Sequence, residues 1–253
     1  MAGEYQQVGG TGEWGNTQAC VGIGGRIWAI SSGLVYCIEP TGTYQQVGDS
    51  SGWEPRFLLG GLAKLYTLEA SGTVFEIDPF TGGYQKTSED GQWASTLSAT
   101  SVRETIITCD QDGSLYRYLP ADRKHERLPV EGTWRSRLLA GTSAGLFTND
   151  NFVVTVEESG SMYAINLGTG QYGQIEGDWS GTRVLAGVGA RVCAITHSGG
   201  MYAIDPVSHT YSQVGSASTW TSRLACGTKS SADASKPNLY TIEDSGTIYE
   251  VTV

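Results

Sequence analysis

Six tryptophans recur along the chain at nearly constant spacing, and this repeat limits the possible folds more than any other feature. The intervals between them are 39, 40, 41, 45 and 41 residues, and only Trp28 lies outside the series. Each member is followed 19 to 26 residues later by a glycine that opens a segment of one small, one hydrophobic and one aromatic residue. Two independent markers therefore give the same register for six repeats. The six pairs are Trp14 with Gly33, Trp53 with Gly72, Trp93 with Gly113, Trp134 with Gly160, Trp179 with Gly199, and Trp220 with Gly246.

Each repeat contains four short segments with the composition of β-strands. In the second repeat these are residues 56–59, 65–69, 73–78 and 83–86, separated by Gly, Pro, Ser and Asp. Short apolar or alternating runs broken by such residues predict strands and tight turns, and helical periodicity is absent. We name the four strands a, b, c and d in chain order. Six units of about 40 residues predict an all-β fold, a six-bladed β-propeller of four-stranded antiparallel blades.

The two ends of the chain carry complementary parts of one repeat. Residues 246–253 have the sequence of a c strand with no d strand after it. Residues 3–8 have the sequence of a d strand with no blade before it, and they nearly duplicate residues 42–47. Pairing of the two ends would complete the last blade and remove exposed sheet edges. We therefore expect a ring closed by the N-terminal strand, and a single domain spanning residues 1–253.

Charge and segment composition limit the function. The chain has 253 residues with 26 acidic and 16 basic side chains, a formal net charge of −10. This balance disfavours nucleic-acid binding, which needs clustered Lys and Arg. The sequence contains no run of about 18 apolar residues, which membrane insertion would need, and its first twenty residues lack the features of a secretory signal. We therefore expect a soluble, cytoplasmic protein.

The cysteines fit the same expectation. They form no CxxC pair and no Cys/His ligand spacing, and an odd number suits a secreted disulfide framework poorly. We predict that all five are reduced and packed in strands as small hydrophobic residues. They are Cys20, Cys37, Cys109, Cys193 and Cys226.

The order of elements within the repeat resembles the tectonin repeat. It runs from Trp through a hydrophobic strand, Leu-Tyr and Ser-Gly-x-hydrophobic-Tyr to Ile-Asp with Thr-Gly, and six copies cover the whole chain. The resemblance implies a six-bladed propeller that binds glycans or lipopolysaccharide. The chain is most similar to the mushroom (fungal) tectonins, which are cytosolic defence lectins that recognise O-methylated sugars. The resemblance therefore implies binding of O-methylated mannose or fucose, or of other surface glycans of bacteria or nematodes. Residues 115–127 in repeat three depart from the pattern.

The segment with each tryptophan should cross from the rim of one blade to the centre of the next, on the same face as the b–c turns. Each groove between blades would then place an indole near a short polar turn. An indole covers an apolar sugar face or a methyl group, and a carboxylate fixes hydroxyls. Packing between the blades is an equal alternative for the indoles, and one residue could serve both roles. The candidates are Trp14, Trp53, Trp179 and Trp220 with Glu69, Glu157 and Glu243.

Arginines stand three or four residues after most of these tryptophans, and blade one has Gln18 and blade three has Thr96 there. We take Arg56, Arg183 and Arg223 as candidate donors to sugar oxygens, with stacking on a tryptophan or pairing with an acid as the alternative. Because repeat three departs most from the pattern, the two tryptophans beside it are expected to contribute less. The arginines are Arg56, Arg137, Arg183 and Arg223, and the two tryptophans are Trp93 and Trp134.

Signals for an enzyme or a metal site are weak. Residues 88–93 come close to the Asp-box of sialidases but differ in spacing and position, and the three histidines lack the spacing of a zinc site. No blade carries a unique acidic cluster that breaks the repeat, so we expect neither catalysis nor a cofactor. The leading hypothesis is a multivalent carbohydrate-binding protein. A propeller scaffold for protein–protein interaction is the alternative, and a propeller-fold glycoside hydrolase or lyase is a remote one.

Two insertions lengthen the connection between strands a and b in blades four and six. They comprise residues 141–149 and 227–238. Such segments are commonly tolerated surface loops. The alternative is a contact between identical copies in a homo-oligomer.

Overall fold

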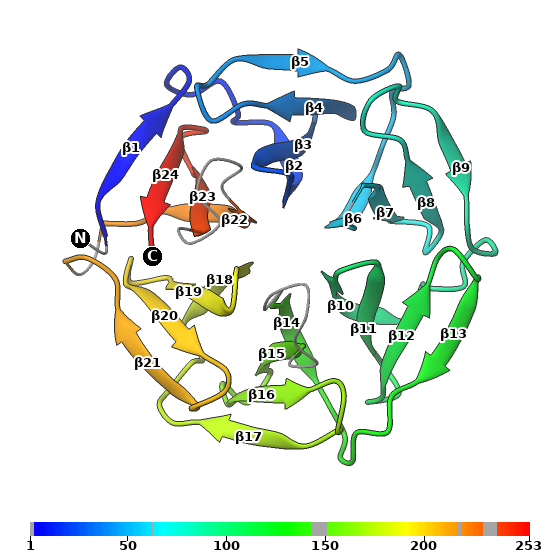
Figure 1. Ribbon diagram of the computed structural model, residues 1–253, viewed down its shortest axis with the longest axis vertical. Helices are drawn as coiled ribbons and strands as arrows, with labels where there is room; N and C mark the ends of the chain where they lie inside the picture. The colour runs from blue at the N-terminus through cyan, green and yellow to red at the C-terminus, as the bar shows by residue number, and fades with distance from the viewer. Residues whose placement is uncertain (1–2, 62, 143–150, 217–218, 230–236) are drawn as a thin grey trace.

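The computed structural model describes residues 3–61, 63–142, 151–216, 219–229 and 237–253, and they form six four-stranded antiparallel sheets arranged as blades in a ring (Figure 1). In each blade the first strand lies nearest the centre of the ring and the last lies at the rim (Figure 1). The predicted six-bladed β-propeller is confirmed.

The strands follow the repeat, from the innermost to the outermost in each blade. Blade 1 contains β2 (Thr17–Ile23), β3 (Arg26–Ser31), β4 (Leu34–Ile38) and β5 (Tyr44–Gln46). Blade 2 contains β6 (Pro55–Gly60), β7 (Leu65–Glu69), β8 (Val74–Ile77) and β9 (Tyr84–Lys86). Blade 3 contains β10 (Thr96–Val102), β11 (Thr105–Asp110), β12 (Leu115–Leu119) and β13 (Lys124–Arg127). Blade 4 contains β14 (Ser136–Gly141), β15 (Phe152–Glu157), β16 (Met162–Asn166) and β17 (Tyr172–Ile175). Blade 5 contains β18 (Thr182–Val188), β19 (Arg191–Thr196), β20 (Met201–Asp205) and β21 (Thr210–Gln213). Blade 6 contains β22 (Ser222–Lys229), β23 (Pro237–Glu243), β24 (Ile248–Thr252) and β1 (Tyr5–Val8).

The ring closes through the two ends of the chain, as their sequences predict. β1 runs antiparallel to β24, with Tyr5 opposite Val251 and Val8 opposite Ile248. Figure 1 shows β1 as the outer strand of the blade that contains the C-terminus. Val8 is 2% exposed and joins the core between blades 6 and 1. The N-terminal strand therefore supplies both hydrogen bonds and core packing to the last blade.

One backbone hydrogen bond joins each repeated tryptophan to the preceding blade. The tryptophan N–H donates to the carbonyl of the repeated glycine in the preceding b–c turn, at 2.9 to 3.3 Å. These glycines have φ between +74° and +85°, a region that other residues rarely adopt. A Cβ on Gly72 would also lie 2.5 Å from the nitrogen of Ala94. The two sequence markers thus form one contact between blades. The donor and acceptor pairs are Trp14 and Gly246, Trp53 and Gly33, Trp93 and Gly72, Trp134 and Gly113, Trp179 and Gly160, and Trp220 and Gly199.

The hydrophobic core lies in six layers between adjacent blades. The layer between blades 1 and 2, for example, contains Ile30 and Val35 from one blade, Leu58 and Leu65 from the next, and Trp53. A tryptophan of the series takes part in each of the six layers. Large aromatic side chains fill the wedge-shaped space between neighbouring sheets at the density of a protein interior.

Glycines let the innermost strands approach one another closely. A Cβ on Gly187 would lie 1.9 Å from the carbonyl oxygen of Gly141, and one on Gly227 would lie 2.0 Å from that of Gly187. A Cβ on Gly22 would lie 2.2 Å from the oxygen of Gly227. Their φ angles are outside the left-handed region, so the close approach of backbones is what requires glycine. We call these four residues the glycine collar.

The blades are of two kinds that alternate around the ring. In blades 1, 3 and 5 a two-residue turn joins the first two strands, at residues 24–25, 103–104 and 189–190. In blades 2, 4 and 6 this connection is longer. The second strands of blades 2, 4 and 6 end at a buried glutamate, whereas those of blades 1, 3 and 5 do not. The ring therefore consists of three pairs of blades. The glutamates are Glu69, Glu157 and Glu243.

Three further predictions concern the whole chain. All five cysteines are unpaired, as predicted. Across the described ranges, no helix is long and apolar enough to cross a membrane. The longer connections of blades 4 and 6 lie between β14 and β15 and between β22 and β23, as predicted, but the ends of both predicted insertions belong to strands: Gly141 ends β14, and residues 227–229 and 237–238 lie in β22 and β23. Residues 143–150 and 230–236, on which a contact between copies would depend, lie outside the described residues.

Candidate functional site

A cluster of aromatic rings occupies each groove between adjacent blades. The tryptophan packs edge to face against one ring from strand c and one from strand d of the blade that follows it. In five grooves the d-strand ring is a tyrosine, and the ring centroids lie 4.9 to 6.1 Å apart. We call these five clusters the aromatic triads. They are Trp14, Tyr36 and Tyr44; Trp53, Phe75 and Tyr84; Trp134, Tyr163 and Tyr172; Trp179, Tyr202 and Tyr211; and Trp220, Tyr249 and Tyr5.

The members of a triad differ strongly in exposure. Trp14, Trp53 and Trp179 are only 3%, 7% and 3% exposed, and Trp220 is partly buried. The five d-strand tyrosines are 46% to 63% exposed. Each triad thus presents a tyrosine to solvent on a base of buried indole. The packing role of the tryptophans is shown by these contacts, and a direct ligand contact by the same indoles stays a prediction.

A polar side chain accompanies the exposed tyrosine. The residue two positions after it in strand d lies opposite the c-strand ring of the triad and is itself exposed. It is glutamine in four blades and Lys86 in blade 2. An amide beside an aromatic ring offers both a donor and an acceptor for hydroxyl groups. The glutamines are Gln7, Gln46, Gln174 and Gln213.

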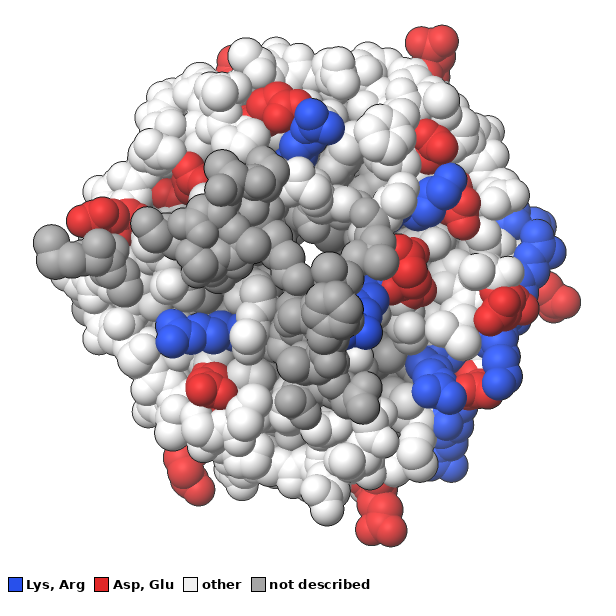
Figure 2. Space-filling view, in the orientation of Figure 1, with Lys and Arg blue, Asp and Glu red and all other residues white. Residues whose placement is uncertain are grey.

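Blade 3 breaks this pattern. His125 takes the place of the exposed tyrosine and lies 4.5 Å from Trp93 and 4.6 Å from Tyr116, measured between ring centroids. Burial lowers the pKa of this histidine. Arg127 stands where the glutamine would be. Figure 2 shows lysines and arginines gathered on the side of the ring where β12 and β13 lie. The departure in repeat three therefore alters the groove of Trp93, whereas the ring contacts of Trp134 are those of an intact triad.

A cleft lies beside the exposed tyrosine of blade 4. A cleft of about 640 Å³ is lined by Tyr172, Gln171, Gly170, Glu131 and His209, among others. An exposed aromatic ring, a carboxylate and an amide therefore border one concave space. That combination suits a ligand with an apolar face and several hydroxyls.

The predicted acidic residues do lie beside the tryptophan segments, but they are buried. Their exposed fractions are 5% to 8%, and each carboxylate accepts a hydrogen bond from the N–H of the residue directly after the tryptophan. The donor–acceptor distances are 2.5 to 2.7 Å. Burial raises the pKa of Glu69. These carboxylates hold the tryptophan-bearing turns, and a sugar contact by them stays a prediction. The acceptors Glu69, Glu157 and Glu243 bind Glu54, Arg135 and Thr221 respectively.

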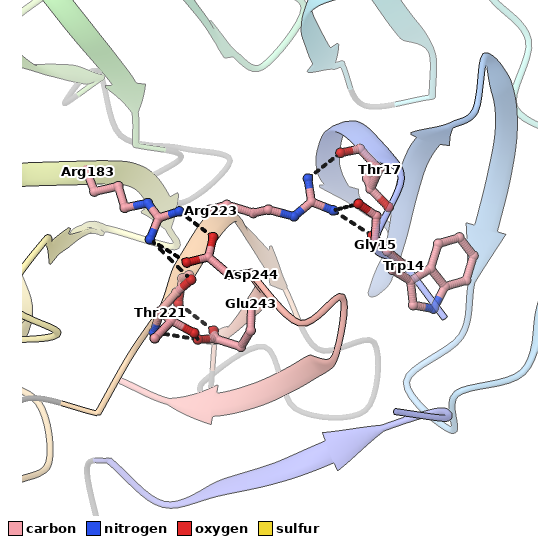
Figure 3. Close-up of polar contacts among 9 residues, drawn as sticks. Trp14, Gly15, Thr17, Arg183, Thr221, Arg223, Glu243 and Asp244 are labelled. Carbon is pink, nitrogen blue, oxygen red and sulfur yellow. Dashed lines mark hydrogen bonds and ion pairs between the residues drawn. The ribbon is translucent and has the colours of Figure 1, made fainter. Parts of the chain in front are cut away.

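Three of the arginines connect one blade to the next. Arg223 donates to the carbonyls of Trp14 and Gly15, at 2.6 and 3.1 Å, and to that of Thr17 (Figure 3). Arg137 makes the same contacts to the turn of blade 5 at 2.6 to 2.9 Å, and Arg56 makes them to the turn of blade 3. All three come from blades 2, 4 and 6. A guanidinium that binds several carbonyls of one turn fixes the angle between two blades.

Arg183 behaves differently. Its guanidinium forms an ion pair with Asp244 of blade 6, one hydrogen bond of which is 3.0 Å long (Figure 3). The hydrogen bond and charge of this pair raise the pKa of Arg183 and lower that of Asp244. A donor role of Arg56, Arg183 and Arg223 toward sugar oxygens stays a prediction, since the donors that the structure shows are directed at the protein itself.

The register of blade 3 corrects one assignment. Every innermost strand has a β-bulge at its second residue, and this bulge carries the arginine in blades 2, 4, 5 and 6. In blade 3 the bulged residue is Leu97, not Thr96, which pairs with Asp110. The tryptophan-bearing turn of blade 3 is one residue longer than that of its neighbours in the ring, which moves the equivalent position by one.

Among the residues that the structure describes, no group of three or more His, Cys, Asp or Glu could hold a metal ion. The exposed tyrosine is a further candidate that the tryptophan–glycine repeat does not predict. Its signal in the sequence is the recurring Tyr-Gln at the start of strand d.

Comparison with known proteins gives the fold and no family. No family model and no curated protein matches the chain. A protein of unknown function from Bacteroides thetaiotaomicron VPI-5482 is 10% identical with a TM-score of 0.67, and the match covers 98% of this chain and 75% of that one. YCF48, solved bound to D1 peptide, is 10% identical with a TM-score of 0.55, covering 94% and 77%. At such identities the class that is shown is the β-propeller.

A third structure is PorZ, a bacterial surface component of the type-IX secretion system of Porphyromonas gingivalis. It is 12% identical with a TM-score of 0.54, and the match covers 98% of this chain and 34% of PorZ. The chain therefore spans about a third of the length of PorZ. At these identities the three matched proteins assign no activity to this chain.

Proposed function

We propose that this protein is a multivalent carbohydrate-binding protein, a lectin, whose sites are the grooves between the blades. The observation that carries the proposal is the fivefold recurrence of a half-exposed tyrosine on a base of buried tryptophan. A ring held in place by its neighbours covers the C–H face of a sugar with little loss of conformational entropy. The exposed amide or amine two residues later supplies hydrogen bonds to hydroxyl groups.

The sequence pattern refines the class of ligand. Its resemblance to the tectonin repeat favours O-methylated mannose or fucose, or other surface glycans of bacteria or nematodes recognised in defence. A methyl group on a sugar oxygen adds apolar surface, which an aromatic ring binds better than a hydroxyl. Five unpaired cysteines favour a reducing compartment, and we place the protein in the cytoplasm.

The repetition of the grooves supports binding rather than catalysis. Simultaneous engagement of several weak sites on a glycan-coated surface raises avidity by roughly 10² to 10⁴. A catalytic site needs a constellation that differs from its surroundings, and the buried glutamates recur in three blades with the same backbone partners. We therefore propose that no reaction follows binding.

The proposal is tested first on glycan arrays that include O-methylated sugars, and then by titration calorimetry with the best monosaccharide. We expect a stoichiometry near five. The variant Tyr84→Ala removes one exposed ring and should lower the stoichiometry to about four. Because Tyr84 is 55% exposed, the variant should stay folded, which its melting temperature will show.

Blade 3 offers the matched control. His125→Ala alters the equivalent position in the groove that lacks a tyrosine, so it should leave the stoichiometry unchanged. Silence across the arrays would overturn the proposal, and so would an unchanged stoichiometry in folded Tyr84→Ala. Recovery of one stoichiometric protein partner whose binding is insensitive to sugars would instead support the scaffold hypothesis.

A further inference from the structure

Two cysteines meet at the place where the ring closes. Cys20 lies on β2 of blade 1 and Cys226 on β22 of blade 6, so the seam between the first and last innermost strands runs between them. Both residues line the central channel, a cavity of about 600 Å³. Cys20 packs against the core cluster that contains Cys226. The other three cysteines lie outside this cluster.

The backbones around this pair approach each other closely. A Cβ on Gly22 would lie 2.2 Å from the carbonyl oxygen of Gly227, the residue directly after Cys226. Strands β2 and β22, which carry the two thiols, pack side by side along this seam. Cys226 is 5% exposed, whereas Cys20 is only partly buried. The geometry therefore places the two thiols on packed neighbouring strands and in one core cluster, with Cys20 the more accessible from the channel.

We propose that Cys20 and Cys226 are an oxidation site, at which a small hydroperoxide entering the channel converts the two thiols into an intramolecular disulfide. In the first step the sulfur of Cys20 attacks a peroxide oxygen, the O–O bond breaks, and a sulfenic acid and water form. In the second step the sulfur of Cys226 attacks the sulfur of Cys20, the S–O bond breaks, and water leaves with the thiol proton of Cys226. Two thiols lose two electrons, and one hydrogen peroxide becomes two waters.

The positions of the two thiols set the order of these steps. The hydrogen bond to Cys20 and, after it, burial raise the pKa of Cys226 well above its usual range. Cys226 therefore stays a neutral thiol at physiological pH, and the thiolate is the reactive form. Cys20, the more exposed partner, reacts first. Cross-linking by the second step should become faster as the pH rises, because it needs the proton of Cys226 to leave.

The disulfide would give the ring a second closure, at its centre, in addition to the pairing of β1 with β24 at its rim. It would link residues near the two ends of the chain and close a loop of about 200 residues. Cross-links that close long loops restrict the unfolded chain most. We expect the melting temperature to rise by about 5 °C or more on oxidation and to return on reduction.

The test uses the full-length protein treated with hydrogen peroxide. We expect the free thiols of the denatured protein to fall from five to three, the mass to fall by two hydrogens, and peptide mapping to yield a fragment joining Cys20 to Cys226. Under non-reducing denaturing conditions the oxidised chain should migrate faster, because a large covalent loop makes it more compact. These measurements need no variant to fold.

Two variants sharpen the test. Cys20→Ser should abolish the cross-link and the rise in melting temperature, whereas Cys37→Ser, which alters a cysteine of another core cluster, should retain both. The proposal is overturned if all five thiols survive peroxide treatment. It is equally overturned if Cys20 is oxidised without joining Cys226, or if it links two chains. None of these outcomes depends on glycan binding.

Discussion

Deletion of residues 1–9 would remove β1 and test whether the ring depends on it. The structure allows a magnitude to be worked out. Loss of Val8, which is 2% exposed, removes about 1.5–3 kcal/mol of apolar burial. Loss of Tyr5 removes its edge-to-face contacts with Trp220 and Tyr249, each contributing about 0.5–1.5 kcal/mol. The expected loss of about 2.5–6 kcal/mol is a large part of the 5–15 kcal/mol typical of a folded domain.

The deletion should also cause aggregation. Without β1, the strand β24 becomes the edge of blade 6, and its unpaired N–H and C=O groups become available to other chains. The assay is urea unfolding of the full-length and truncated proteins together with size-exclusion chromatography. Gln7→Ala is the matched control, because its side chain is exposed on the same strand and should change the stability by less than about 0.5 kcal/mol. A truncated protein that melts like the full chain and stays monodisperse would refute closure by β1.

Two further predictions concern the packing of the innermost strands. Gly187→Ala would place a Cβ 1.9 Å from the carbonyl oxygen of Gly141 and should lower the free energy of unfolding by about 1–3 kcal/mol or more. Gly181→Ala, in the same blade with open space around it, should change the free energy of unfolding little. Equal urea midpoints for the two variants would contradict the close packing of the glycine collar. Burial raises the pKa of the Cys193 thiol to about 12. Because the unfolded chain then releases this proton at a lower pH than the folded one, the stabilisation from the buried neutral thiol is complete below about pH 8.5 and falls as the pH rises toward 12. Between pH 8 and pH 10.5 the wild type should lose about 2.5 kcal/mol more than Cys193→Ala in urea titrations. Parallel pH profiles of the two proteins would exclude the Cys193 thiol as the cause.

The repeat predicted the architecture because each of its markers has a local structural cause. The tryptophan and the glycine recur together because one donates a hydrogen bond to the other across a blade boundary. The Ile-Asp signature recurs because the carboxylate accepts hydrogen bonds from the next turn, as Asp78 does from Phe80 and Thr81 at 2.9 and 3.0 Å. Such contacts act over a few residues or between neighbouring blades, and therefore leave a trace in every copy.

The candidate site was less predictable because its composition depends on which blade a side chain faces. The sequence places Trp134 after the altered strand of repeat three, but its ring packs against Tyr163 and Tyr172 of the following blade. The division into two kinds of blade did leave a signal. The tryptophan precedes the bulged residue by four positions in blades 1, 3 and 5 and by three in the others. When a single spacing is assumed for all six blades, this difference is lost, and Thr96 is assigned to the position that Leu97 occupies.

The features that recur in every second blade and those that recur in five successive grooves lie at different distances from the centre of the ring. Two features recur in every second blade, near the channel: the arginines that donate hydrogen bonds to the next blade, and the buried glutamates. They fix the angles between blades. The aromatic triads recur in five successive grooves near the rim, irrespective of the kind of blade. The arginines and glutamates bind the backbone of the tryptophan-bearing turns, but the ring contacts of the five triads are alike in both kinds of blade, so the five tyrosines are presented alike. A glycan-coated surface would therefore meet five similar grooves and one gap at blade 3, where a histidine and basic side chains stand instead.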